Sequence, residues 1–207
     1  MTKQTILAAA AATGLAAGAM AQERFPTLTP ETMTPEQRRA AEGIVSGPRG
    51  GLRGPFNAWL RSPEVADRFQ RVGEHLRFNS TIPPRLNEFA ILITAREWTS
   101  QYEWYAHHRL AMAAGLPANI AADLAAGRRP EGMNDDERIV FEFCTELHRT
   151  RVVSDATFNA AKARFGEQGV IDLIAVSGYY VAVAMTLNVA QVPLPPDATP
   201  LPPLPAR

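Results

Sequence analysis

Apolar residues recur at helical spacing through most of the chain. One such pattern runs from residue 63 to about 77, with apolar positions three or four residues apart. Caps and apolar stripes predict further helices over residues 35–47, 85–98, 100–114, 117–126 and 167–189, with two more beginning near 135 and 154. No segment combines sustained polar–apolar alternation with hairpin turns, so the pattern predicts an all-α fold.

Two predicted helices are apolar enough to raise a second interpretation. Residues 85–98 include β-branched Ile91, Ile93 and Thr94, which would suit a strand, but the helical pattern runs through the whole segment. Residues 170–187 have the apolar character of a membrane span. Polar Asp172 and Asn188 near the ends of this stretch favour a core or subunit-interface helix, so no stable membrane span is expected once the leader is cleaved.

Residues 1–21 have the three parts of a secretory signal peptide. A short start with one basic residue precedes an apolar stretch at 6–17 and a small-residue cleavage site at 19–21. An uncleaved membrane anchor is the alternative, although the apolar stretch is short for a bilayer. Cleavage after Ala21 would make the mature protein periplasmic or secreted.

Composition indicates one globular domain with tails. The 207 residues are 46% hydrophobic, and 21 Lys and Arg balance 21 Asp and Glu, so no basic excess points to nucleic acid. Cys144 is the only cysteine, which excludes an internal disulfide and a two-cysteine redox cycle. It lies in an apolar helical stripe and is interpreted as a buried small hydrophobe.

Polar residues of chemical interest concentrate between Arg85 and His108. Ser100, Glu103 and His107 are spaced i, i+3 and i+7, so they share one face of one predicted helix. In one interpretation Glu103 orients His107 for general acid–base chemistry. In the other, Ser100 and Glu103 form a capping box and His107 is a core or interface histidine.

Glu88 lies early in the apolar helix at 85–98, where a carboxylate is costly unless it is paired or hydrogen-bonded. It could be an acid or base with a shifted pKa. It could equally form a structural salt bridge with Arg85 or Arg96. The pattern does not choose between these two roles.

Metal and cofactor chemistry find little support. The chain has no Gly-rich phosphate loop and no H-E-x-x-H motif. Neighbouring histidines on a helix diverge by about 100° and so do not chelate together. Aromatic residues near this turn, Trp104 among them, belong more often to a core or subunit contact than to a substrate site. The potential metal ligands considered are His75, Glu103, His107, His108 and His148.

These residues resemble the carboxymuconolactone decarboxylase family, which includes the alkylhydroperoxidase D-like proteins. The most specific part is Glu88 followed by Ala-Arg-Glu-Trp-Thr-Ser-Gln-Tyr-Glu-Trp-Tyr-Ala-His at 95–107 and Ala-Gly-Leu-Pro at 114–117. The segments 136–140 and 178–188 are also similar. The resemblance spans about residues 54–193 and implies a helical domain at 54–192. The capping box at 34–37 predicts one short helix in the preceding extension at 22–53, and the Pro-rich composition predicts an extended, disordered tail at 193–207.

The resemblance implies an all-α helical bundle of the alkylhydroperoxidase D-like type that assembles into a homotrimer or homohexamer. The peroxidase branch of this family has a Cys-x-x-Cys pair, and here Ser100 and Glu103 stand in those two positions. Disulfide-cycled peroxide reduction is therefore not expected. The decarboxylase branch is more similar, because it has a Glu-x-x-x-His that Glu103 and His107 match.

The expected function is that of a cofactor-free lyase or isomerase acting on a small carboxylated lactone or related acid, without a metal. Two alternatives are a non-catalytic exported helical oligomer that binds a small ligand, and a degenerate peroxidase that uses Cys144 alone. For the lyase, the expected roles are His107 as proton donor, Glu103 as its orienting partner, Glu88 as second acid or base, Ser100 as hydrogen-bond donor, and Arg85, Arg96 and Trp104 as substrate-binding residues.

Overall fold

The computed structural model describes residues 24–204, so the predicted leader lies outside the described residues. Within that range the regular structure is all helix, which confirms the all-α prediction. The helices are α1 (Pro35–Val45), α2 (Phe56–Trp59), α3 (Pro63–Phe78), α4 (Pro84–Glu97), α5 (Gln101–Ala113), α6 (Ala118–Ala125), α7 (Asp135–Thr150) and α8 (Asp155–Ala190).

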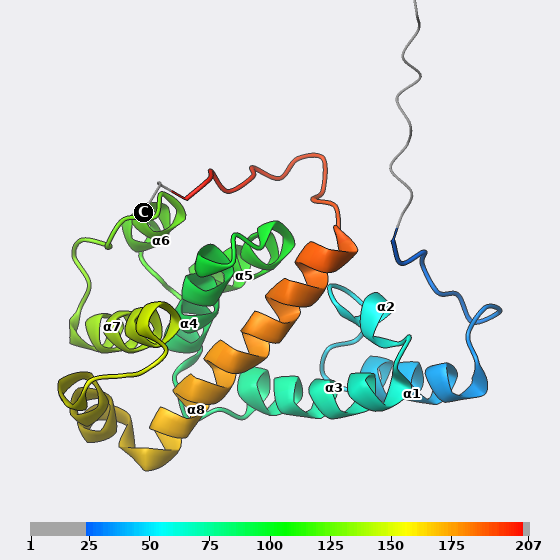
Figure 1. Ribbon diagram of the computed structural model, residues 1–207, viewed down its shortest axis with the longest axis horizontal. Helices are drawn as coiled ribbons and strands as arrows, with labels where there is room; N and C mark the ends of the chain where they lie inside the picture. Colours follow the sequence, from blue (N-terminus) through cyan, green and yellow to red (C-terminus); the bar gives the residue numbers. More distant parts are fainter. Residues whose placement is uncertain (1–23, 205–207) are drawn as a thin grey trace, which may run out of the picture.

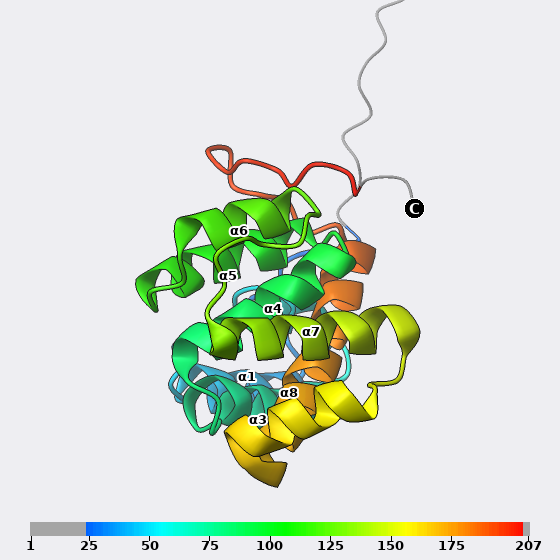
Figure 2. The same cartoon turned by 90° about the vertical axis from the view of Figure 1, so that its left-hand side faces the viewer.

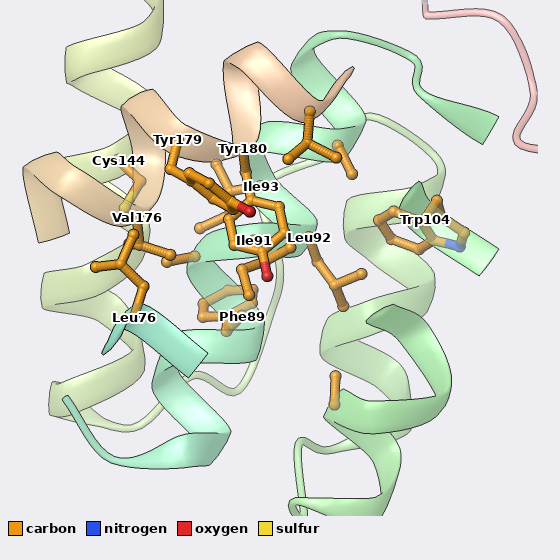
Figure 3. Close-up of a cluster of buried hydrophobic side chains, with 14 of the residues drawn as sticks. Leu76, Phe89, Ile91, Leu92, Ile93, Trp104, Cys144, Val176, Tyr179 and Tyr180 are labelled. Atoms are coloured by element: carbon orange, nitrogen blue, oxygen red, sulfur yellow. The ribbon is translucent and has the colours of Figure 1, made fainter. Parts of the chain in front are cut away.

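Helix α4 is the centre of the molecule. Every residue from 86 to 96 is buried, as expected for a helix that is apolar on nearly all sides. It packs against α5, α6, α7 and α8 (Figures 1 and 2). Its apolar side chains meet those of the other helices in one continuous core (Figure 3). The helix interpretation of residues 85–98 is therefore confirmed, and the strand interpretation is wrong.

Local capping chemistry explains where several helices begin and end. Thr34 and Gln37 form both hydrogen bonds of a capping box at α1, as predicted. Asn134 and Glu137 form a second capping box at α7. After α5, Gly115 has a φ of 88°, the left-handed conformation that glycine adopts at the end of a helix.

Helix α8 joins the two sides of the molecule. It is interrupted at Gly166, where φ is 72° and ψ is 178°, so it consists of the two helices predicted from 154 and 167. A stretch of 18 residues in α8 has a mean hydropathy of 1.8, so by length and composition the helix could cross a membrane. In the structure one face of α8 packs on α4, α5 and α7 and another on α3, so it serves as a core helix (Figure 1).

Helices α1, α2 and α3 form a smaller N-terminal layer beside α8 (Figure 1). Trp59 connects this layer to α8, because its indole Nε1 donates to Thr186 Oγ1 at 2.8 Å. The rings of Phe69 and Tyr179 meet that of Trp59 edge-on, with centroids 5.0 and 6.0 Å away. Within the predicted extension, α1 packs against α3 and so belongs to this layer.

The Pro-rich tail lies on the body of the protein over its described part, up to residue 204 (Figure 1). Leu201 is buried, and its backbone N–H and C=O bond to the side-chain amide of Gln101 at 2.8 and 3.1 Å. The described part of the tail contains no helix or strand, and the contacts of Leu201 hold it against the body instead of leaving it disordered as predicted. A local Pro-rich pattern carries no information about a distant apolar site that can bury one leucine.

Asp172 on α8 holds the turn that leads into α4. Its Oδ2 accepts hydrogen bonds from Ser80 Oγ, Thr81 N and Thr81 Oγ1 at 3.0, 2.7 and 2.8 Å. Burial raises the pKa of this carboxyl, but the hydrogen bonds from Thr81 and Ser80 and the nearby His75 outweigh that effect and leave the pKa below its ordinary value. The ionised carboxylate therefore stabilises the connection between α3 and α4.

Replacing Asp172 with alanine should lower the free energy of unfolding by about 2 kcal/mol at neutral pH, because buried donors lose their acceptor. Denaturant unfolding would measure this loss.

Because the native pKa of Asp172 is lowered, its stabilisation is present above the unfolded-state pKa and is lost as pH falls toward the native pKa. The difference from wild type should shrink in acid. Asp135→Ala, at an exposed position, is the control and should change stability by less than about 0.5 kcal/mol; equal stability of wild type and Asp172→Ala would contradict the role.

Candidate active site

A cavity of about 520 Å³ lies between α5, α8 and the N-terminal layer. Its polar lining includes four arginines, one glutamate, one histidine and four tyrosines, and apolar side chains complete the wall. A concave site with few polar groups among apolar ones is typical of small-molecule binding. The lining residues used below are Arg49, Arg53, Phe56, Arg77, Glu103, Tyr105, His107, Arg109, Tyr179 and Tyr180.

His107 and Glu88 form a buried pair at the edge of this cavity. His107 Nδ1 lies 2.7 Å from Glu88 Oε2, and the two residues are 8% and 9% exposed. Glu88 comes from α4 and His107 from α5. The edge-to-face ring of Tyr180, with its centroid 4.8 Å away, also contacts the imidazole. This arrangement fixes the ring and leaves Nε2 as the nitrogen that the pair does not use.

The expected partner of His107 is therefore corrected. Glu103 does not hydrogen-bond His107, and neither of its carboxyl oxygens has a hydrogen-bond partner among the described residues. The capping interpretation is also wrong, because the Ser100 side chain makes no cap bond and its buried Oγ has no partner in residues 24–204. Helical spacing brings Glu103 near His107, but Glu88 reaches the imidazole across the α4–α5 contact.

Glu103 occupies an unusual environment for a carboxyl group. It is 1% exposed and lines the cavity wall. Burial raises its pKa well above the ordinary value of 4.5. Glu88 and Glu103 therefore differ in environment. Glu88 is hydrogen-bonded to His107, whereas Glu103 has no hydrogen-bond partner in the described chain.

Four arginines give the cavity an excess of positive charge. Arg49, Arg53, Arg77 and Arg109 line it, and no ion pair to an acidic side chain is found for any of them within residues 24–204. Arg49 and Arg109 lie over the rings of Phe56 and Tyr105, at 5.1 and 5.8 Å from the centroids. Unpaired guanidinium groups in a cavity favour an anionic ligand, above all a carboxylate.

Gly73 allows two of the cavity groups to approach α3 closely. A Cβ atom at this position would lie 2.2 Å from Tyr179 Oη and 2.4 Å from Arg49 Nη2. Burial raises the pKa of Tyr179 to about 12, although Arg49 and Arg77 act in the opposite direction. The phenol therefore keeps its proton at neutral pH and can donate a hydrogen bond.

The three residues expected to bind substrate do not line this cavity. Arg85 forms an ion pair with Glu137 at the start of α7. Arg96 is buried, its three guanidinium nitrogens have no hydrogen-bond partner in the described part of the chain, and desolvation lowers its pKa. Trp104 is buried against His108, with ring centroids 5.9 Å apart, and lies away from Tyr179 and Tyr180 (Figure 3).

Local pattern offers little indication of the arginines that line the cavity in their place. Arg49 and Arg53 belong to a Gly-, Pro- and Arg-rich stretch that reads only as a loop. Arg77 and Arg109 lie in α3 and α5 without a distinctive local motif. Tyr179 and Tyr180 belong to a segment that carries the family resemblance, which is the one signal that could have found them.

The Cys144 side chain is buried and has no access to solvent. Its Sγ accepts a hydrogen bond from Ser177 Oγ at 3.6 Å, and burial raises its pKa to about 12. A thiol in this state is a poor nucleophile because the reactive form is the thiolate. Among residues 24–204, no group of three His, Cys, Asp or Glu side chains is arranged to hold a metal ion.

Comparison of the chain with protein-family models finds no match, and comparison with curated proteins finds none either. The resemblance to the carboxymuconolactone decarboxylase family therefore rests on the residues quoted for it. The geometry adds that Glu88 and His107, two residues of that resemblance, are in direct contact.

Cys144 should not react with an aromatic disulfide reagent in the folded protein, because its thiol is buried and protonated. One equivalent of thiol should appear when the protein is unfolded in denaturant, as measured by absorbance of the released thiolate. Rapid labelling of the native protein would contradict this expectation and would support the single-cysteine peroxidase alternative.

Proposed function

We propose that this protein is a cofactor-free acid–base enzyme, similar to carboxymuconolactone decarboxylase, that acts on a small carboxylated lactone or related acid. The observation that carries the proposal is the buried Glu88–His107 pair at a cavity lined by four arginines without ion pairs. The pair supplies acid–base chemistry, and the arginines supply the means to hold an acid.

The cavity arginines come from three separate elements of the fold. Arg49 and Arg53 come from the loop before α2, Arg77 from α3 and Arg109 from α5. A carboxylate bound by these groups would be placed close to the His107 ring. Holding a reactant in this way removes part of the entropic barrier to reaction.

In the proposed decarboxylation, the bond between carbon and the departing carboxylate breaks and its electron pair moves onto the conjugated lactone carbonyl oxygen. Carbon dioxide leaves. His107 Nε2 then gives a proton to carbon as the oxyanion electrons return, and solvent restores the proton. Glu88 holds the ring through Nδ1 and leaves Nε2 as the nitrogen that gives the proton.

The second candidate is a non-catalytic protein that binds a small acid in the same cavity. It is favoured by the arginines alone and makes no use of the Glu88–His107 pair. A peroxidase that depends on Cys144 receives no support from the buried position of that residue. Periplasmic or secreted localisation is proposed from the signal-peptide pattern.

We also propose that α8 contacts a second copy of the chain, as the family resemblance implies for a homotrimer or homohexamer. Its outer face exposes Ile171, Ile174, Met185 and Val189, with Gly178 in the middle. No charged residue lies between Asp172 and the end of α8. An uncharged apolar stripe of this length is more typical of a protein contact than of a solvated face.

His107→Asn should reduce turnover of carboxymuconolactone by at least about 100-fold, followed by ultraviolet absorbance, because the general acid is lost. The asparagine amide can replace Nδ1 as the partner of Glu88, which limits unfolding. His108→Asn is the matched control, since His108 stacks on Trp104 and does not line the cavity. Full turnover in His107→Asn would contradict the assignment; no turnover in wild type would favour the binding-protein alternative.

Light scattering after size-exclusion chromatography should give a mass of three or six chains for the wild-type protein. Ile174→Glu combined with Met185→Glu should shift the mass toward one chain, because buried charges would oppose the contact. Val72→Glu, at an exposed position on α3, is the control and should keep the wild-type mass. A monomeric wild type would show that α8 does not mediate self-association.

A further inference from the structure

The second carboxyl group of the site has no assigned role in the steps above. Among the described residues that line the cavity, Glu103 is the only acid. It is one helical turn before His107 on α5, and it forms neither the expected bond to His107 nor a helix cap. A residue so placed is either a structural defect or a group whose partner arrives with the ligand.

The surroundings of Glu103 do not support a negative charge. Both carboxyl oxygens are shielded from solvent, and no arginine lies within ion-pair distance, although Arg49 and Arg77 line the same cavity. The other titratable groups nearby are His107 on α5, which is bonded to Glu88 of α4, and Tyr179 of α8, which is electrostatically coupled to Glu103. An unpaired buried carboxylate is far less stable than a buried carboxylic acid.

We infer that Glu103 enters the reaction as a neutral carboxylic acid whose O–H donates a hydrogen bond to the substrate oxygen on which negative charge develops. This inference rests on the proposed function for the identity of that oxygen, the lactone carbonyl. The proton stays on Glu103, so the electron count of the decarboxylation is unchanged. A donor already in place and shielded from water stabilises an oxyanion more than a solvated one does.

This role separates the two acids of the site. Glu88, hydrogen-bonded to His107, holds the imidazole that delivers a proton to carbon. Glu103 offers a hydrogen bond to oxygen. The protonated phenol of Tyr179 lines the same cavity and is a second neutral donor. Neighbouring carboxyl groups in unlike environments commonly take unlike roles.

The protonation state can be tested in the free protein by infrared spectroscopy at neutral pH. The wild type should show the carbonyl stretch of a buried carboxylic acid, and Glu103→Gln should lack it. Glu131→Gln, at an exposed position, is the control and should keep it. Absence of this band from the wild type would overturn the inference whatever the enzymatic activity.

A second readout is the pH dependence of stability. Because the native pKa of Glu103 is raised, its contribution is fully present below the unfolded-state pKa and is lost as pH rises toward the native one. Glu103→Gln should therefore gain stability relative to wild type as pH rises above 4.5. A constant difference across that range would show that Glu103 is ionised in the native state, against the inference.

The hydrogen bond to ligand can be tested with paraconate, a saturated lactone that carries a carboxylate and lacks the conjugation needed for decarboxylation. Its lactone carbonyl band should move to lower frequency on binding to wild type and to Glu103→Gln, which keeps an N–H donor. The band should stay near its solution position in Glu103→Leu. An equal shift in all three proteins, or no binding to wild type, would overturn the donor role; a wild type that shows both bands as expected but no turnover would contradict only the proposed reaction.

Discussion

The burial of α4 on all sides is the constraint on which the rest of the structure depends. A helix surrounded by α5, α6, α7 and α8 must place any polar side chain it carries against a neighbour. Glu88 meets that requirement with His107, and the turn held by Asp172 sets where α4 begins. The packing of the core and the orientation of the imidazole therefore have the same origin.

The site combines polar groups from two parts of the fold with different chemical character. The α4–α5 contact supplies a histidine held by a carboxylate, in surroundings that exclude water. The N-terminal layer supplies arginines that retain access to the cavity. Acid–base groups thus lie in one part of the cavity wall and most anion-binding groups in another, which suits a ligand with a charged end and a reacting end.

Features determined by nearby residues could be predicted from the sequence, and features determined by long-range contacts could not. The capping box at Thr34, the C-terminal glycine after α5 and the buried character of α4 all follow from local pattern. Glu88 and His107 were recognised as candidates, but their contact across two helices was not. Glu103 has the right helical spacing to pair with His107, yet spacing alone does not decide which of two acids reaches the ring.

The arginines of the cavity show even more strongly that long-range contacts cannot be predicted from local pattern. Arg49 and Tyr179 lie far apart along the chain, and only the glycine at position 73 lets both approach α3. Arg85 and Arg96 were better candidates by proximity in sequence to Glu88, but Arg85 is paired with Glu137 and Arg96 points elsewhere than into the cavity. A single sequence contains no local signal for such an assembly.

The separation of Arg49 and Arg53 from the acid–base pair has a thermodynamic consequence. A molecule in which the N-terminal layer opened locally would keep α4, α5 and the Glu88–His107 contact but would lose three of the four cavity arginines, Arg49, Arg53 and Arg77. An anionic ligand held by these arginines would bind only the closed form, so its binding would oppose local opening by mass action. Substrate concentration would then govern how often the N-terminal layer detaches, and with it the exposure of the loop at 47–55 to proteases.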